Sequence, residues 1–202
     1  MQIRLGIITC LFVSSVCFAD ASDYDYVQVA YASANNDIAS GADFSGFGVK
    51  GSFQFYRDFY GSVRYVDVSD DGEIAGLSAS AEQLNLGIGY IFGANETASL
   101  YGEVNYIDVS ASASLGGVTA SASDDGYGVG AGVRLNTGPR SELHFGVLHE
   151  EIGSLFSETT FVGEWLFDFF PSESDGVAIS GLLGYNSTSG GESVYFGARV
   201  SF

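Results

Sequence analysis

The sequence predicts an all-β fold: a closed, antiparallel, up-and-down transmembrane β-barrel of ten strands, with eight strands as the second choice. Three observations predict this fold. Apolar and polar residues alternate with a period of two along most of the chain. The segments between the predicted strands alternate between short and long, and the N-terminus is typical of an exported protein.

Residues 1–19 are predicted to be a cleaved signal peptide, which leaves a single barrel domain over residues 20–202. Arg4 is the only charge before a run of about a dozen mostly apolar residues, shorter than the roughly 20 that a membrane-spanning helix needs. We expect cleavage after Ala19, with Ala21 as the second choice. Both cysteines lie in this segment, so the mature chain has no thiol and no disulfide.

Composition restricts the classes of partner. The chain has a formal charge of -18, from 7 Lys and Arg against 25 Asp and Glu. Nucleic acid is therefore not an expected partner, because binding to a phosphate backbone needs clustered basic residues. The 28 Gly, 12 Tyr and 16 Phe, together with the lack of a long amphipathic run, indicate strands and turns rather than helices.

Each predicted strand has one apolar face and one face of polar or small residues. The C-terminal strand is the clearest, because every second residue from Val194 to Phe202 is apolar. The ten segments are 26–33, 44–56, 59–66, 83–92, 100–110, 126–136, 142–150, 160–170, 177–186 and 193–202. Residues 59–69 and 100–110 are identical at seven of eleven positions, which indicates a repeating hairpin of about 40 residues.

Period-two alternation fits a soluble sheet with its apolar face inward, or a membrane barrel with that face toward lipid. The connections favour the barrel, since short periplasmic turns and long external loops alternate in that fold. The short connections are 57–58, 93–97, 136–141 and 171–175, and the longer ones are 34–43, 69–82, 111–125, 151–159 and 187–192.

Aromatic residues at the strand ends favour the same choice, because membrane barrels carry aromatic girdles at both interfaces. At the short-turn end we expect outward Phe53, Phe55, Phe59, Phe92, Phe167, Phe169 and Phe202. At the loop end we expect outward Tyr31, Tyr65, Tyr106, Tyr127 and Tyr185. The other face is mostly Gly, Ser, Asn and Gln, whereas a soluble sheet would expose Lys and Glu there.

The chain ends in Tyr195-Phe196-Gly197-Ala198-Arg199-Val200-Ser201-Phe202. With this end and its overall pattern, the chain resembles the small outer-membrane β-barrel proteins of Gram-negative bacteria, grouped with the OmpA transmembrane domain, OmpX and Ail. The resemblance covers the whole mature chain and implies a location in the outer membrane. It also implies recognition of the last strand, ending in Phe202, by the barrel-assembly machinery. Those families usually have eight strands, so the predicted ten depart from their pattern.

The predicted lumen carries charges of both signs and bulky aromatic side chains. We expect inward basic residues to pair with inward acidic ones and fill the interior, because buried charges are tolerated when paired. The basic residues are Lys50, Arg64, Arg134 and Arg199, and the acidic ones are Glu103, Glu142, Glu164 and Asp168. We also expect Tyr60, Tyr101 and Tyr195 to occupy the space left by Gly87, Gly89, Gly128, Gly130 and Gly132.

No catalytic or metal-binding residue is assigned. The chain has two histidines, His144 and His149, and neither has the His-x-Ser spacing of outer-membrane lipid A deacylases. Glu142, His144 and Glu150 form a candidate acid/base set. Residues 67–78 match part of a calcium loop, with Asp67, Ser69, Asp71 and Gly72 in place, but Ser78 stands where a bidentate Glu belongs. Together with Asp124 and Asp125, these residues are expected to be solvated, with loose binding of divalent cations as the alternative.

These observations predict a non-catalytic, monomeric outer-membrane barrel that contacts lipids and lipopolysaccharide and uses its external loops for surface contact or adhesion. A small ion-conducting pore is the alternative function, and a lipid A modifying hydrolase is the least favoured one.

Overall fold

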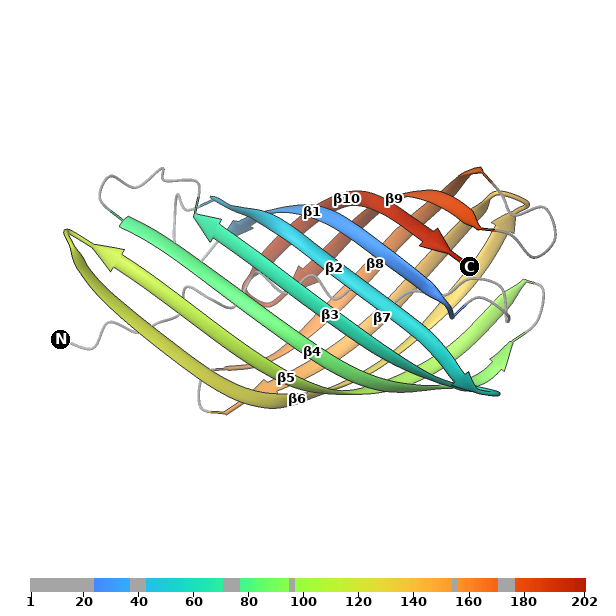
Figure 1. Ribbon diagram of the computed structural model, residues 1–202, viewed down its shortest axis with the longest axis horizontal. Helices are drawn as coiled ribbons and strands as arrows, with labels where there is room; N and C mark the ends of the chain where they lie inside the picture. The colour runs from blue at the N-terminus through green and yellow to red at the C-terminus, as the bar shows by residue number, and fades with distance from the viewer. Residues whose placement is uncertain (1–23, 37–42, 71–76, 95–96, 154–155, 171–176) are drawn as a thin grey trace.

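Ten strands close into one antiparallel barrel in the computed structural model of the chain, which describes residues 24–36, 43–70, 77–94, 97–153, 156–170 and 177–202 (Figure 1). Every strand pairs with its neighbours along the chain, and β1 pairs with β10 to complete the barrel. The prediction of ten strands is therefore confirmed, and the alternative of eight is wrong. The predicted signal peptide lies outside the described residues.

All ten predicted segments are strands, most of them longer than predicted. The strands are β1 (Tyr26–Asn36), β2 (Asp43–Tyr56), β3 (Phe59–Asp70), β4 (Leu77–Ala94), β5 (Ala98–Leu115), β6 (Val118–Gly138), β7 (Ser141–Ile152), β8 (Phe156–Phe170), β9 (Ala178–Thr188) and β10 (Gly191–Ser201). Within the described ranges, no helix is long and apolar enough to cross a membrane.

The apolar face of each strand points outward, as predicted for a membrane barrel. On β10, Val194 and Phe196 are 51% and 60% exposed, whereas Tyr195 and Arg199 between and beyond them are 0% and 1% exposed. The same arrangement, with apolar side chains outside and polar ones inside, holds around the barrel, where exposed aliphatic and aromatic side chains alternate with buried polar ones. Such an arrangement is stable only when the outside is lipid rather than water.

Aromatic rings on the outer surface cover glycines of neighbouring strands. A Cβ atom added to Gly102 on β5 would lie 3.0 Å from the ring of Phe92 on β4, and one added to Gly61 would lie 3.9 Å from Phe55. Gly181 has the same relation to Phe169. Because a ring over a glycine restores the contact area that the missing side chain lacks, these pairs stabilise the sheet near the short-turn end.

The short-turn end follows one repeated pattern. The hairpins β2–β3, β4–β5, β6–β7 and β8–β9 each contain a register shift close to the turn. At the last three shifts, a backbone N–H joins neighbouring hairpins, as in the bond from Ile91 N–H to the Asp58 carbonyl at 2.9 Å. The N–H of Phe202 donates in the same way to the Asp25 carbonyl at 3.0 Å. Bulges at a barrel rim increase the local twist of the strands.

The predicted long external loops are mostly wrong, because the strands continue through them. Residues 111–125 form the continuation of β5 and β6, joined by Gly116 and Gly117 with φ of 59° and 86°. A turn with two positive φ angles matches the twist of a hairpin and strongly favours glycine. Similarly, β3 and β4 extend to residues 70 and 77, β7 and β8 to 152 and 156, and β9 and β10 to 188 and 191.

Candidate functional site

Two parts of the barrel contain chemistry beyond lipid contact: the polar lumen, and the external ends of β4, β5 and β6. The lumen is filled by buried side chains of both charges, packed among tyrosines. The external ends continue the sheet beyond the outward tyrosines at one end of the barrel, where the β5–β6 hairpin projects farther than the neighbouring strands (Figure 1).

A chain of hydrogen bonds crosses the lumen from β5 to β10. The Tyr101 hydroxyl lies 3.0 Å from His144 Nε2, and His144 Nδ1 lies 2.8 Å from Glu164 Oε2. The other oxygen of Glu164 accepts a hydrogen bond of 2.8 Å from the Tyr195 hydroxyl. All four side chains are buried, so this chain links four strands through an interior that water does not reach freely.

A second cluster forms around the carboxylate of Glu150 on β7. Its Oε1 atom lies 3.3 Å from Arg64 Nη2 and accepts hydrogen bonds from the side-chain amides of Gln83 at 3.2 Å and Asn85 at 3.3 Å. These donors come from β3 and β4 on the facing wall, so the cluster ties two walls of the barrel together. A carboxylate with several donors is the geometry that makes a buried charge tolerable.

The remaining basic residues have different partners. Arg134 Nε lies 2.8 Å from Glu142 Oε1, so one of the predicted basic residues pairs with one of the predicted acidic residues. Arg199 instead donates two hydrogen bonds, of 2.9 and 3.3 Å, to the Gln28 amide oxygen, and its guanidinium lies 4.6 Å from the ring centre of Tyr26. Such a cation–π contact stabilises a desolvated cation without a carboxylate.

Several predicted partners of these charges are engaged elsewhere. Glu103 accepts a hydrogen bond of 3.0 Å from the Ser62 hydroxyl, and Asp168 accepts one of 2.6 Å from Ser180. Glu164 is bound to His144, as described above. The prediction of paired charges filling the lumen is therefore right in kind, and among the ion pairs described above the Arg134–Glu142 pair joins a member of the predicted basic set to a member of the predicted acidic set.

Tyrosine rings fill the space above inward glycines, as predicted, and the structure places Tyr60 over Gly89 and Tyr101 over Gly132. A Cβ atom at either glycine would overlap the ring. Tyr195 has this relation with Gly184, which was not among the predicted glycines. The other predicted glycines have different neighbours: Gly87 faces Asn105, Ser62 and Glu103, Gly128 faces Ile107 and Glu150, and Gly130 faces Leu148.

The acid/base set of Glu142, His144 and Glu150 does not form. Glu142 binds Arg134 and Glu150 binds Arg64, while both ring nitrogens of His144 face other side chains, Tyr101 and Glu164. The order tyrosine–histidine–glutamate resembles a nucleophile, base and orienting acid. Its members are fully or almost fully buried, however, so the arrangement does not present a nucleophile to a substrate.

The acidic residues of the predicted loops lie on strands where they are described. Asp67 and Ser69 are in β3, so they do not belong to a calcium loop, and Asp71 and Gly72 lie outside the described residues. Asp124 and Asp125 are in β6. Among the described residues there is no group of three or more His, Cys, Asp or Glu side chains that could hold a metal ion.

At the external ends, serine and alanine alternate in register on three adjacent strands. Ser80 on β4 pairs with Ser112 on β5, which pairs with Ser121 on β6, and the next rows contain alanines. The alanines at 81 and 111 are buried inside, so the hydroxyls lie on the outer face. The hydroxyl oxygens of Ser80 and Ser112 lie 3.0 Å apart.

This hydroxyl face, which we define by Ser80, Ser110, Ser112, Ser121 and Ser123, borders a groove of about 360 Å³ that Glu82 also lines. The outer edge of β6 next to it is open. In the described part of the chain, Val118–Ser123 pair with β5 and with no strand on the other side. An open edge presents unpaired backbone N–H and C=O groups.

No protein-family model and no curated protein matches this chain. Solved outer-membrane barrels match its fold. The β-domain of the autotransporter Brka from Bordetella aligns with a TM-score of 0.54 and 11% identity, covering 89% of this chain and 98% of that one. The transport unit of the autotransporter AIDA-I from Escherichia coli aligns with a TM-score of 0.52 and 10% identity, covering 95% of this chain and 93% of that one.

Ail, the attachment invasion locus protein of Yersinia pestis, aligns with a TM-score of 0.47 and 16% identity, covering 89% of this chain and 97% of that chain. At such identities a likeness shows the fold alone. Together with the outward apolar face and the closed ten-stranded topology, the matches define this chain as a small barrel of the outer-membrane type.

Proposed function

We propose that this chain is a non-catalytic integral outer-membrane barrel whose external strand ends make contacts at the cell surface. The observation that carries the proposal is the three-stranded extension of β4, β5 and β6, with its hydroxyl face and its open β6 edge. In a barrel with short periplasmic turns, this end faces the exterior. The apolar outer face below it is expected to contact the lipids and lipopolysaccharide of the outer membrane.

The extension is suited to binding an extended polypeptide. Its open edge at Val118–Ser123 offers backbone donors and acceptors to an added strand, while the small side chains of this segment leave the approach unobstructed. The adjacent groove offers hydroxyls and the carboxylate of Glu82 to the partner's side chains. Backbone pairing would supply affinity, and the groove would supply selectivity.

The lumen supports this function over a pore. Tyr24, Tyr60, Ile91 and Tyr101 form a buried apolar cluster in the interior toward the short-turn end. Above it, the Glu150 cluster and the Tyr101–Tyr195 hydrogen-bond chain cross from wall to wall. We therefore expect no large, steady conductance from the purified protein in a planar bilayer.

The test is adhesion of cells that display the protein. Ser110 and Ser123 face each other across β5 and β6, so residues 111–122 can be replaced by an Asn-Gly turn without changing the register below. Wild-type cells are expected to adhere to immobilised matrix proteins, and the shortened variant is expected to lose adhesion at equal surface display. A matched control replaces Ser189-Gly190, between β9 and β10, by Asn-Gly.

Equal adhesion of cells displaying the wild-type and shortened proteins would contradict the role of the extension. Stable channels whose ion selectivity changes when Glu103 is neutralised would favour a pore instead.

A further inference from the structure

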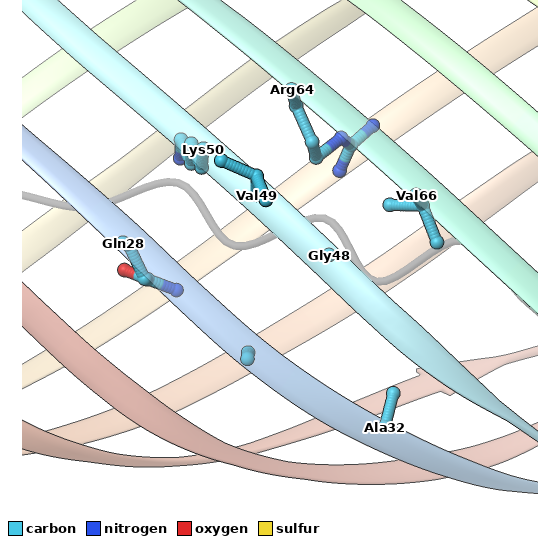
Figure 2. Close-up of a pocket in the computed structure, with 8 residues that line it drawn as sticks. Gln28, Ala32, Gly48, Val49, Lys50, Arg64 and Val66 are labelled. Carbon is cyan, nitrogen blue, oxygen red and sulfur yellow. The ribbon is translucent and has the colours of Figure 1, made fainter.

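A small cavity lies inside the barrel wall formed by β1, β2 and β3. Gln28, Lys50 and Arg64 supply its polar lining, and Ala30, Ala32, Gly48, Val49 and Val66 supply the rest. Figure 2 shows these side chains grouped on the three strands. The cavity has a volume of about 20 Å³, enough for one particle of about the size of a water molecule or slightly larger.

Lys50 lines this cavity and is only 5% exposed. Its ammonium makes no hydrogen bond and no ion pair within 4.0 Å with any side chain of the described ranges. The carboxylates that act most strongly on it are those of Glu103 and Glu164, and both lie beyond the distance of an ion pair. A buried ammonium without a contact partner is costly, so the cavity beside it is a place where a compensating group is favoured.

Positive charge accumulates around this point. Lys50 on β2 is directly opposite Arg64 on β3. On its other side Lys50 is opposite Gln28 on β1, which in turn is opposite Arg199 on β10. Like charges in directly opposed positions destabilise a sheet. Of these three cations, Arg64 has the carboxylate of Glu150 in contact, whereas Arg199 rests on a neutral amide and an aromatic ring.

The polar lining also favours an acceptor over a donor. An ammonium and a guanidinium can only donate hydrogen bonds. The amide oxygen of Gln28, the one acceptor among the three side chains, already accepts two hydrogen bonds from Arg199. A water molecule placed here would have to turn its own hydrogens toward groups that cannot accept them, whereas an anion accepts from all sides.

A neighbouring cavity provides a contrast. It shares Lys50 and Arg64 but is also lined by Ser62, Asn85, Asn105 and the carboxylate of Glu103. Its volume is about 10 Å³, close to the limit for one water molecule. The mixture of donors and acceptors suits water, so the two cavities on either side of Lys50 differ in the particle that they favour.

From this geometry we propose that the cavity bordered by Gln28, Lys50 and Arg64 is an internal binding site for a small monatomic anion, such as chloride. The small volume leads us to assign a monatomic anion rather than a polyatomic one such as sulfate or phosphate. The ion would complete the charge balance of the wall formed by β10, β1, β2 and β3, and it would lie within the lumen rather than on the surface. This site is independent of the proposed contact function of the external strand ends.

The first test compares unfolding of the refolded protein in detergent in sodium chloride and in sodium gluconate at equal ionic strength. A ligand that binds only the folded state raises stability as its concentration passes the dissociation constant. We expect the urea midpoint of the wild type to rise with chloride or bromide and to reach a plateau, and to show no such saturating rise with gluconate or sulfate, whose general salt effect does not saturate. Lys50→Met is expected to abolish the difference between anions.

The control variant is Arg140→Met, which removes an exposed cation in the β6–β7 turn and is expected to keep the wild-type response. An equal response of the wild type to chloride and gluconate would overturn the proposal, as would an undiminished chloride effect in Lys50→Met.

The second test does not depend on whether Lys50→Met folds. Crystals of the wild type grown in sodium bromide are expected to show an anomalous peak beside the Lys50 ammonium. Bromide peaks confined to the surface, with water beside Lys50, would overturn the proposal.

Discussion

The ring of Tyr195 on β10 occupies the space that a side chain at Gly184 on β9 would need, while its hydroxyl donates a 2.8 Å hydrogen bond to Glu164 on β8. One residue therefore fixes the packing of one neighbour and the position of a carboxylate two strands away. The same relation of ring to glycine recurs at Tyr60 and Tyr101.

Gly184→Ala is expected to destabilise the barrel by about 1–3 kcal/mol, because the added methyl group must displace the Tyr195 ring in a packed interior. Gly163→Ala is the matched control. Its added Cβ would lie 4.0 Å from its nearest neighbour, the ring of Phe145, which is ordinary contact. Urea unfolding of both variants in the same detergent measures the difference, and equal destabilisation would contradict the packing described.

Arg64→Ala is expected to cost about 3–5 kcal/mol, because it removes a cation in contact with the buried carboxylate of Glu150. The double variant Arg64→Met, Glu150→Leu is expected to recover much of this loss, since both charges are then absent. Unfolding midpoints of the single and double variants measure the recovery. A double variant that is less stable than Arg64→Ala would show that the pair itself contributes the stability.

His144→Ala is expected to lower the stability of the barrel without abolishing any enzymatic activity. The reason is that the imidazole joins Tyr101 to Glu164 inside the packed lumen. The measurement pairs an unfolding curve with an assay of phospholipid and lipid A hydrolysis by wild type and variant. Hydrolysis by the wild type that disappears in the variant would instead identify an enzyme.

Val133→Arg is expected to cost about 2–4 kcal/mol, because this outward position on β6 lies in the lipid-facing band. Gly130→Ser, on the inward face of the same strand, is expected to cost less. Folding titrations in lipid vesicles give both values. The reverse order would mean that the two faces are assigned the wrong way round.

Deleting Phe202 is expected to reduce the yield of assembled barrel in the outer membrane more than the loss of one apolar side chain, about 2 kcal/mol, would explain. The ring is 58% exposed on the outside of the barrel, so its removal leaves the packing of the lumen in place. Cell fractionation measures the yield of each protein in the outer membrane, and refolding of the purified proteins in vitro measures their stability without the assembly machinery. Equal membrane yields of the two proteins would count against a recognition role.

The fold was predictable because a strand in a membrane barrel has strong contrast between its two faces. On β10 every second residue is apolar, and Val194, Phe196 and Val200 are also large, so both the strand and its outward face are visible in the sequence. The contrast disappears where Ser and Ala alternate, as at 110–114 and 119–123, since both side chains are small. Except for Ser110, the residues of those segments were predicted to lie in the 111–125 loop, although they pair in register as strands.

The lumen contacts were predictable only where two partners lie on one hairpin. Arg134 and Glu142 flank the short β6–β7 turn, so their proximity follows from the turn alone. Arg64 and Glu150 are on β3 and β7 and meet across the lumen, at a height set by strand tilt and register around the barrel. The alternation of side chains along each strand predicts that both residues point inward, but it does not predict which residue each one contacts.

The sequence repeat shared by β3 and β5 has a consequence for how barrels of this kind change size. Both strands run in the same direction and carry a tyrosine, Tyr60 or Tyr101, that lies over a glycine of the next strand. Excising β3 together with β4 would bring β2 beside β5, which is antiparallel to it, and would leave both chain ends on the same side. The hairpin, rather than the strand, is thus the module by which such a barrel can be enlarged or contracted with its topology preserved, and circumference becomes a heritable variable that changes in steps of two strands.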